Sequence, residues 1–220
     1  MRLRLTISPS DGIVDYNYYT KLVGVLHKWL GNNELHGKLS LYSFSWLKGG
    51  ISEGNGLIFP QGASMFFSFY DEHYLKQILK AILHDPKIFY GMQVTDVEIQ
   101  ETPDFSNKTL FLCGSPIFIH RQDENKKYIH YTYESALVGD LLKETLLYKM
   151  KMAGLPPDET LQVRFDTTYP KKKIKLIDYR GVKNRVNLCP VIIQGKPETK
   201  AFAWNVGLGN STGIGLGSIY

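Results

Sequence analysis

The first hundred residues alternate between strand-type and helix-type hydrophobic patterns in one order. Apolar residues recur at every second position in RLRLTIS, residues 2–8, as in a half-buried strand. They recur at helical spacing in two later segments, which stop at Gly31 and just before Pro86. Asp15 or Asn17 is expected to cap the first helix. In order, strands are expected at 2–8, 39–47, 56–70 and 91–100, and helices at 18–30 and 71–85. The resulting order, βαββαβ, predicts an α+β, ferredoxin-like sheet.

The second half repeats this pattern less completely. It contains strand-like runs, a basic hairpin and one evident helix, from about 134 to 151. We therefore predict tandem ferredoxin-like (RRM-like) domains, 1–104 and 105–220, of which the second is a modified copy with a C-terminal glycine-rich loop.

That glycine-rich stretch, GLGNSTGIGLGSIY at 207–220, has five glycines in eleven residues. A P-loop or a dinucleotide-binding turn needs a helix after its glycines, and only three residues follow Gly217. The Walker-type Lys and Ser/Thr are also missing. We therefore expect no nucleotide cofactor, and interpret the glycines as a place where chain segments approach closely.

Positive charge gathers in one segment of the chain. The net charge is +5, yet KKKIKLIDYRGVKNR, residues 171–185, carries seven Lys and Arg against the single acid Asp178. Such a strand-turn-strand suits a polyanion, because each phosphate contact releases counterions. An edge hairpin protected by lysines against aggregation would have the same composition, so charge alone leaves both interpretations open.

Composition excludes several other classes. No apolar run is long enough to span a membrane, and the N-terminus does not resemble a signal peptide, so we expect a cytoplasmic protein. Cys113 and Cys189 lie far apart in the sequence without clustered histidines, which predicts neither a zinc site nor a disulfide. Ser-His-Asp, H-E-x-x-H and paired-carboxylate patterns do not occur, and no metal or other cofactor is expected.

The remaining chemical groups suit RNA cleavage. His36 lies in a loop between a helix and a strand, and His27 lies beside the apolar stripe of the first helix. A base can deprotonate the ribose 2′-OH, a cation or N–H can stabilise the phosphorane, and an acid can protonate the leaving 5′-oxygen. This reaction needs no metal and leaves a 2′,3′-cyclic phosphate.

Four segments together point to a family. The chain resembles the CRISPR repeat-processing endoribonucleases, the sixth Cas family of the RAMP superfamily, over essentially its whole length. The segments are YNYYTKLVGVLHKWL at 16–30, ELHGKLSLYSFS at 34–45, GSPIFI at 114–119 and VGLGNSTGIGLG at 206–217. The resemblance implies an endoribonuclease that cuts precursor CRISPR RNA within its repeats to make guide RNAs for antiviral defence. It also implies that the glycine loop packs between the two domains and takes part in RNA binding.

The resemblance assigns candidate catalytic residues. His36 matches the family's catalytic histidine, and His27 is a candidate second histidine, with the acid and base roles open between them. Where relatives carry a catalytic lysine, this chain has Ser40, and Lys38 is the nearby candidate for the positive charge. The first-helix tyrosine of some relatives falls near Leu26 or His27 and is absent.

RNA contacts follow from the same resemblance. We expect contacts from the basic segment and the glycine loop, namely Lys171, Lys172, Lys173, Lys175, Arg180, Lys183, Arg185, Gly207, Gly209, Gly213, Gly215 and Gly217. The expected partner is CRISPR repeat RNA, recognised as a stem-loop or as an unpaired strand. The main alternative is a non-catalytic RNA-binding or scaffold subunit of a CRISPR effector complex, and a homodimer also stays open. The chain lacks the signature of an RNA-recognition motif. The aromatic residues of MFFSFY, at 65–70, are explained more simply by core packing than by base stacking.

Overall fold

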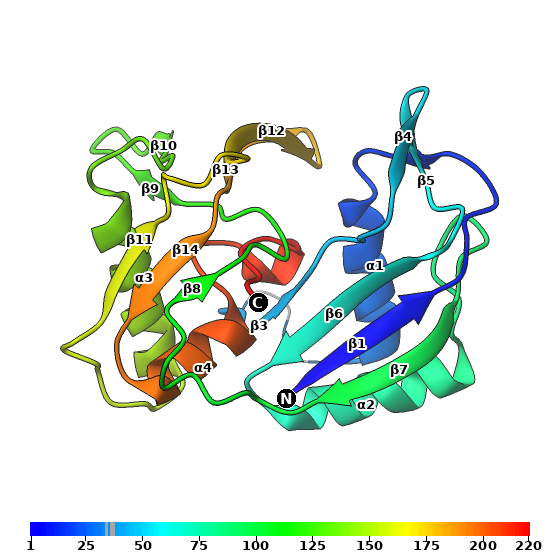
Figure 1. The fold of residues 1–220 in the computed structure, drawn as a ribbon, viewed down its shortest axis with the longest axis horizontal. Coiled ribbons are helices and arrows are strands. Elements are labelled where there is room, and N and C mark those ends of the chain that lie inside the picture. The colour runs from blue at the N-terminus through cyan, green and yellow to red at the C-terminus, as the bar shows by residue number, and fades with distance from the viewer. Residues whose placement is uncertain (34, 36–37) are drawn as a thin grey trace.

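The computed structural model describes residues 1–33, 35 and 38–220 of the 220-residue chain. Its first half forms the expected ferredoxin-like unit, with two helices on one face of an antiparallel sheet in the order β3-β6-β1-β7 (Figure 1). The elements are β1 (Arg2–Ile7), α1 (Tyr19–Leu30), β3 (Tyr42–Phe44), β6 (Ala63–Phe69), α2 (Glu72–His84) and β7 (Val94–Gln100). A small sheet beside it contains β2 (Val14–Asp15), β4 (Ile51–Glu53) and β5 (Gly56–Ile58).

Apolar burial between helices and sheet holds this unit together. Leu3, Leu5 and Ile7 alternate along β1 and are buried against α1 and α2, as the sequence pattern predicted. The predicted cap of α1 was wrong. The helix begins after Tyr18, without a side-chain cap, and Asp15 instead accepts a hydrogen bond from the Tyr90 hydroxyl. The cap of α2 is Asp71, which accepts from the His73 N–H at 2.9 Å.

The second half is a more complete copy than expected. Its core sheet has the order β11-β14-β8, and the last residues of the chain continue it beside β8, since Leu112 and Tyr220 exchange two backbone hydrogen bonds of 2.9 Å. The elements are β8 (Leu110–Phe111), β9 (His120–Gln122), β10 (Tyr128–His130), α3 (Val138–Met152), β11 (Gln162–Phe165), β12 (Lys173–Tyr179), β13 (Val182–Leu188), β14 (Val191–Gln194), α4 (Pro197–Val206) and a 3-10 turn (Thr212–Ile214).

The sequence analysis missed the second helix of this half, α4. Its apolar residues do not form one stripe, because α4 is buried on nearly all sides: they share a core cluster with residues of the second sheet, and α4 also touches β3 and β6 of the first. Both halves therefore contain βαββαβ, and α4 joins them. None of the described helices is long and apolar enough to cross a bilayer.

Candidate active site and nucleic-acid interface

A cavity of about 270 Å³ lies where the two halves meet. Three of the four predicted catalytic residues line it: His27 from α1, and Lys38 and Ser40 from the loop that leads to β3. The fourth, His36, falls outside the described residues. The complete lining is Val23, His27, Leu35, Lys38, Ser40, Tyr42, Tyr179, Arg180, Ser211, Gly213 and Ile214.

The opposite wall comes from the second half of the chain. Arg180, predicted only as an RNA contact, lines the same cavity as His27 and Lys38, next to Tyr179. The sequence analysis did not single out Tyr42, Tyr179 or Ser211. In the sequence, these three residues were marked only by their nearness to residues that had been predicted. More than 130 residues separate the two walls, so only folding shows that they belong to one site.

The position of Arg180 is set by the turn between β12 and β13. Arg180 and Gly181 both have positive φ, 53° and 82°, as in the two-residue turns that join twisted antiparallel strands. The carboxylate of Asp178 accepts from the Gly181 N–H at 2.8 Å. The Tyr19 hydroxyl of α1 also donates to the Asp178 carbonyl, so the hairpin tip is held against the first half.

A small apolar cluster supports the docking of the β12–β13 hairpin on the first half. Ile177 and Val186 from the hairpin are buried with Tyr19 of α1 and Leu216 of the glycine segment. The Tyr19 ring stacks on Trp46, with a centroid separation of 5.1 Å. The hairpin, α1 and the glycine segment thus share one small core beside the cavity.

Burial also shifts the pKa of one hydroxyl in the cavity, that of Tyr42. Burial raises the pKa of Tyr42, a hydrogen bond from Ser40 opposes this rise, and Tyr179 adds to it. Tyr42 is therefore a neutral hydroxyl at physiological pH.

The glycine segment, residues 207–217, packs between the halves. A Cβ on Gly213 would lie 2.2 Å from Ser40 Oγ, one on Gly215 would lie 2.7 Å from the Phe44 ring, and one on Gly209 would lie 2.3 Å from the Phe118 carbonyl. Gly207 and Gly217 donate their N–H groups to the carbonyls of Ala203 and Pro116, at 2.8 and 2.7 Å. These two N–H groups hold the fold together, and RNA contacts by the segment stay a prediction.

The close approach at Gly217 leads to a stability prediction. Its φ is +73°, and an added Cβ would lie 2.0 Å from the Leu208 carbonyl oxygen. Gly154 has φ +74° with nothing within 4 Å, so Gly154→Ala isolates the backbone strain. We expect Gly154→Ala to cost about 1 kcal/mol of unfolding free energy, and Gly217→Ala about 3 kcal/mol because overpacking is added. Urea denaturation measures both, and equal losses would contradict the close packing of this segment.

The seven basic residues of 171–185 divide among several places. Lys173 and Lys175 lie on the hairpin face that also carries the buried Ile177, whereas Lys183 and Arg185 lie on the opposite face. Lys171 and Lys173 line a second cavity of about 270 Å³, with Tyr220. The structure therefore does not gather all seven on one surface.

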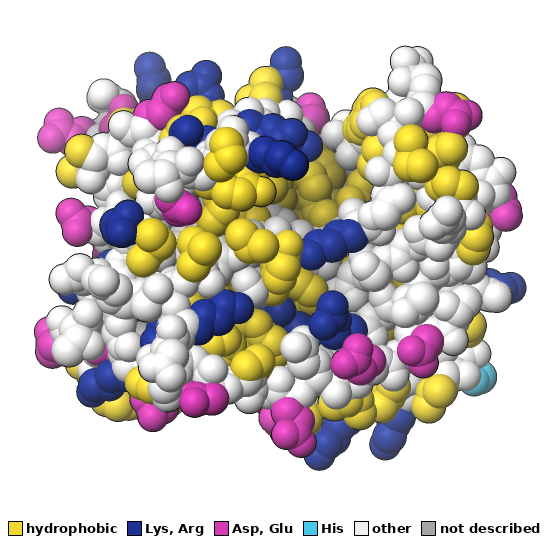
Figure 2. Space-filling model, viewed as in Figure 1, with side chains coloured by type: hydrophobic (Ala, Val, Ile, Leu, Met, Phe, Trp, Pro, Cys, Tyr) yellow, Lys and Arg dark blue, Asp and Glu magenta, His cyan; other side chains and the backbone are white. Residues whose placement is uncertain are grey.

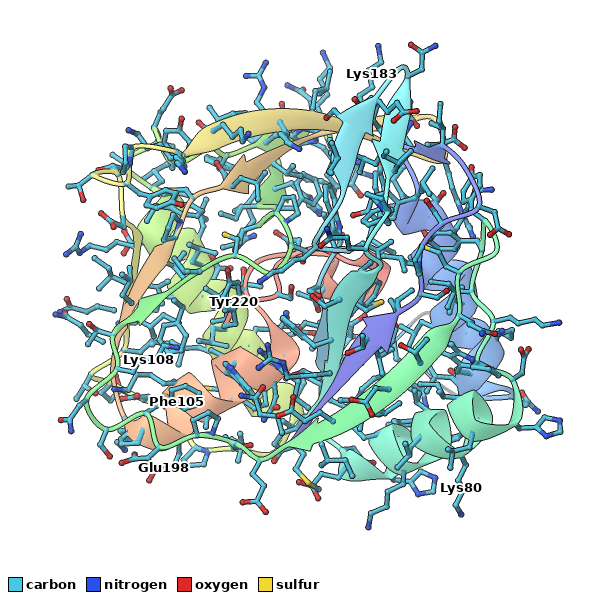
Figure 3. The ribbon with its side chains drawn as sticks, turned by 45° about the vertical axis from the view of Figure 1, so that its right-hand side comes forward. Lys80, Phe105, Lys108, Lys183, Glu198 and Tyr220 are labelled. Atoms are coloured by element: carbon cyan, nitrogen blue, oxygen red, sulfur yellow. The ribbon has the colours of Figure 1, made fainter. Side chains whose placement is uncertain are left out.

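Cations also gather at the junction of the two halves. Lys and Arg side chains lie along part of the rim of a hollow with hydrophobic walls between the two halves (Figure 2). Tyr220 lies between the halves, and Lys183 lies at the outer edge of the molecule (Figure 3). The Lys48 ammonium lies 3.6 Å from the centroid of the Tyr220 ring. A nucleic-acid strand bound along the hollow would thus meet a different set of cations from a nucleic-acid strand bound at the outer face of the hairpin.

Comparison with known proteins agrees with this architecture. Residues 99–220 match the family model for the C-terminal part of the CRISPR associated protein Cas6. No curated protein matches the sequence.

Several solved structures resemble the whole chain, and the three described next are each matched over all of it. One, described as a CRISPR associated protein Cas6, is 16% identical with a TM-score of 0.84, and 98% of that chain is covered. A Cas6-related protein from Pyrococcus furiosus is 20% identical with a TM-score of 0.86, over 97% of its chain. A RAMP protein described as binding different RNA substrates is 19% identical with a TM-score of 0.86, over 98% of its chain. These likenesses confirm the tandem ferredoxin-like fold. Because the family model matches more than half of the sequence, the chain belongs to the CRISPR associated protein Cas6 family.

Proposed function

We propose that the protein is a metal-independent endoribonuclease that cuts precursor CRISPR RNA within the repeat. Membership of the Cas6 family supports a role in CRISPR RNA processing. The observation that carries the proposal is the cavity where His27, Lys38 and Arg180 converge from both halves of the chain. An imidazole and two cations around one space suit a phosphate whose charge increases during reaction.

The roles follow from the chemistry of 2′-OH attack. His36 and His27 act as the acid–base pair: one removes the 2′-OH proton, and the other protonates the departing 5′-oxygen. Lys38 and Arg180 stabilise the phosphorane, and Ser40 hydrogen-bonds a phosphate oxygen. The 2′-oxygen bonds to phosphorus as the bond to the 5′-oxygen breaks, which gives a 2′,3′-cyclic phosphate and a 5′-OH end.

RNA binding is assigned to the hairpin cations and the glycine segment, of which Arg180 and Gly213 also line the cavity. The hairpin cations supply affinity through phosphate contacts. The glycine segment contributes by bringing the RNA backbone close to the cavity, where Gly213 and Ser211 line the wall.

The test uses end-labelled cognate repeat RNA incubated with the protein in excess EDTA. We expect cleavage at one site, full resistance of RNA with a 2′-deoxy nucleotide 5′ to that site, and a cyclic phosphate end in the product. Cleavage that stops in EDTA and returns with Mg²⁺ would refute the metal-independent mechanism. Tight binding without cleavage would instead support the scaffold alternative.

Arg180 and Lys183 allow a matched comparison within one hairpin. Arg180 lines the cavity, whereas Lys183, three residues away, is exposed on the outer face. We expect Arg180→Ala to lower the single-turnover cleavage rate about 100-fold, because a cation beside the phosphorane is lost. We expect Lys183→Ala to leave that rate unchanged at saturating protein and to reduce the salt dependence of binding by about one phosphate contact. Equal effects on the rate would remove Arg180 from the catalytic group.

A further inference from the structure

The side chain of Lys149 is buried in the second half, with only 2% of its surface exposed. Lys149 is on α3, and its ammonium lies 3.3 Å from each of three acceptors: the carbonyls of Val206 and Gly207, and the Thr212 hydroxyl. An ammonium has three N–H donors, so these acceptors use all of them. Burial lowers the pKa of Lys149 to about 7, which reflects what it costs to place a charge there.

The two carbonyl partners are at the end of a helix. Val206 is the last residue of α4 and Gly207 follows it, so their carbonyls lack partners within the helix and lie at its negative end. No carboxylate lies within ion-pair distance of Lys149 in the part of the chain that the structure describes. The helix end is therefore what compensates its charge.

The third partner leads across the interface to the candidate active site. The Thr212 hydroxyl accepts from Lys149 and donates to the backbone carbonyl of Ser40, at 3.3 Å. Lys149 also lines a cavity of about 330 Å³ that shares Ser40 and Ser211 with the candidate active site. Ser40 and Ser211 thus form a wall between the two cavities, with Lys149 on one side and the candidate catalytic groups on the other.

We propose that Lys149 is a positioning residue for RNA cleavage: it fixes the glycine segment to α3, and through Thr212 it holds Ser40 and the loop carrying Lys38 in place. The inference rests on the proposed endoribonuclease function. Lys149 does not touch the RNA. Without its ammonium, Thr212 and the end of α4 lose their shared donor, and the wall of the cavity is free to shift. Small displacements of this kind have large effects on rate because the reacting groups must be aligned.

The experiment combines substitutions at both ends of this link. Lys149→Met keeps the length of the side chain and removes the donors. Thr212→Val removes the hydroxyl at constant shape, and Thr212→Ser restores it. Lys151→Met, on the exposed side of α3, is the matched control. Each protein is measured for single-turnover cleavage of repeat RNA, for binding of the 2′-deoxy RNA, and for thermal unfolding.

We expect Lys149→Met to slow cleavage about 100-fold, with binding of the 2′-deoxy RNA within twofold of wild type. Thr212→Val should slow cleavage about tenfold, and Thr212→Ser should recover the wild-type rate. The double variant that combines Lys149→Met with Thr212→Val should be no slower than Lys149→Met, since both substitutions act through one link. If Lys149→Met does not fold, the Thr212 pair alone decides the question.

Three outcomes would overturn the inference. The first is cleavage at the wild-type rate by folded Lys149→Met, or by Thr212→Val where Lys149→Met does not fold. The second is additive effects in the double variant, and the third is a loss that Thr212→Ser does not recover. A wild-type protein that cuts no repeat RNA would overturn the proposed function together with this inference, whereas unaffected variants beside an active wild type would overturn this inference alone.

Discussion

His36→Ala is expected to lower single-turnover cleavage of repeat RNA by about 10²- to 10⁴-fold, the usual contribution of a general acid or base. The expectation rests on the predicted correspondence of His36 to the family's catalytic histidine and on its place in the sequence. Its sequence neighbours Leu35 and Lys38 line the cavity that also contains His27. Loss of an imidazole removes proton transfer and no phosphate contact, so binding of the 2′-deoxy RNA should stay within about threefold of wild type.

The control for His36 is His84→Ala, at the exposed end of α2. This variant should cleave at the wild-type rate, because His84 is not among the residues that line the cavity. His36→Ala protein that remains folded and cuts as fast as wild type would exclude His36 and transfer its role to another group. In that case His27→Ala becomes the deciding variant.

Arg2→Ala is expected to destabilise the fold by about 4 kcal/mol, through lost hydrogen bonds and a cavity. Arg2 is 2% exposed, and its guanidinium lies between the rings of Phe66 and Trp204, 3.7 and 3.5 Å from their centroids. It donates to Ser68 Oγ at 2.6 Å and to the carbonyls of Trp204 and Ile219 at 2.7 and 2.8 Å. One side chain from the first strand thus holds α4 and the end of the chain.

Arg4→Ala is the matched control for Arg2, because Arg4 is on the same face of β1 and is exposed. Urea denaturation should place Arg4→Ala within about 0.5 kcal/mol of wild type. Arg2→Met separates packing from hydrogen bonding: it fills the space between the rings but leaves three acceptors unpaired, so its loss should be smaller than that of Arg2→Ala. Equal stability of Arg2→Ala and Arg4→Ala would show that the contacts of Arg2 do not hold the halves together.

Arg2 also shows where a hydrophobic pattern stops being informative. Alternation in β1 correctly assigned Leu3, Leu5 and Ile7 to the buried face. It placed Arg2 on the polar face, which alternation leaves to solvent, although α4 and the last residues of the chain cover Arg2 there. A pattern with period two reports only which side chains share a face, and what covers that face comes from segments more than 200 residues away.

The same limit applies to the candidate site. The family resemblance of the sequence grouped His27, Lys38 and Ser40, which lie within fourteen residues around one helix-to-strand loop and line one cavity. It did not place Arg180 beside them, since that depends on the docking of the β12–β13 hairpin on Tyr19. Lys149 resembles its neighbours on α3 in sequence, and only packing against the end of α4 distinguishes it.

Local periodicity and turn residues therefore determined the βαββαβ order of the first half, and the resemblance of four sequence segments indicated the family. Tertiary structure alone decided that α4 completes the second half and which cations share a surface. It also decided which polar groups are buried at the junction. The physical reason is that periodicity is set by backbone geometry within one element, whereas burial and charge pairing depend on which elements meet.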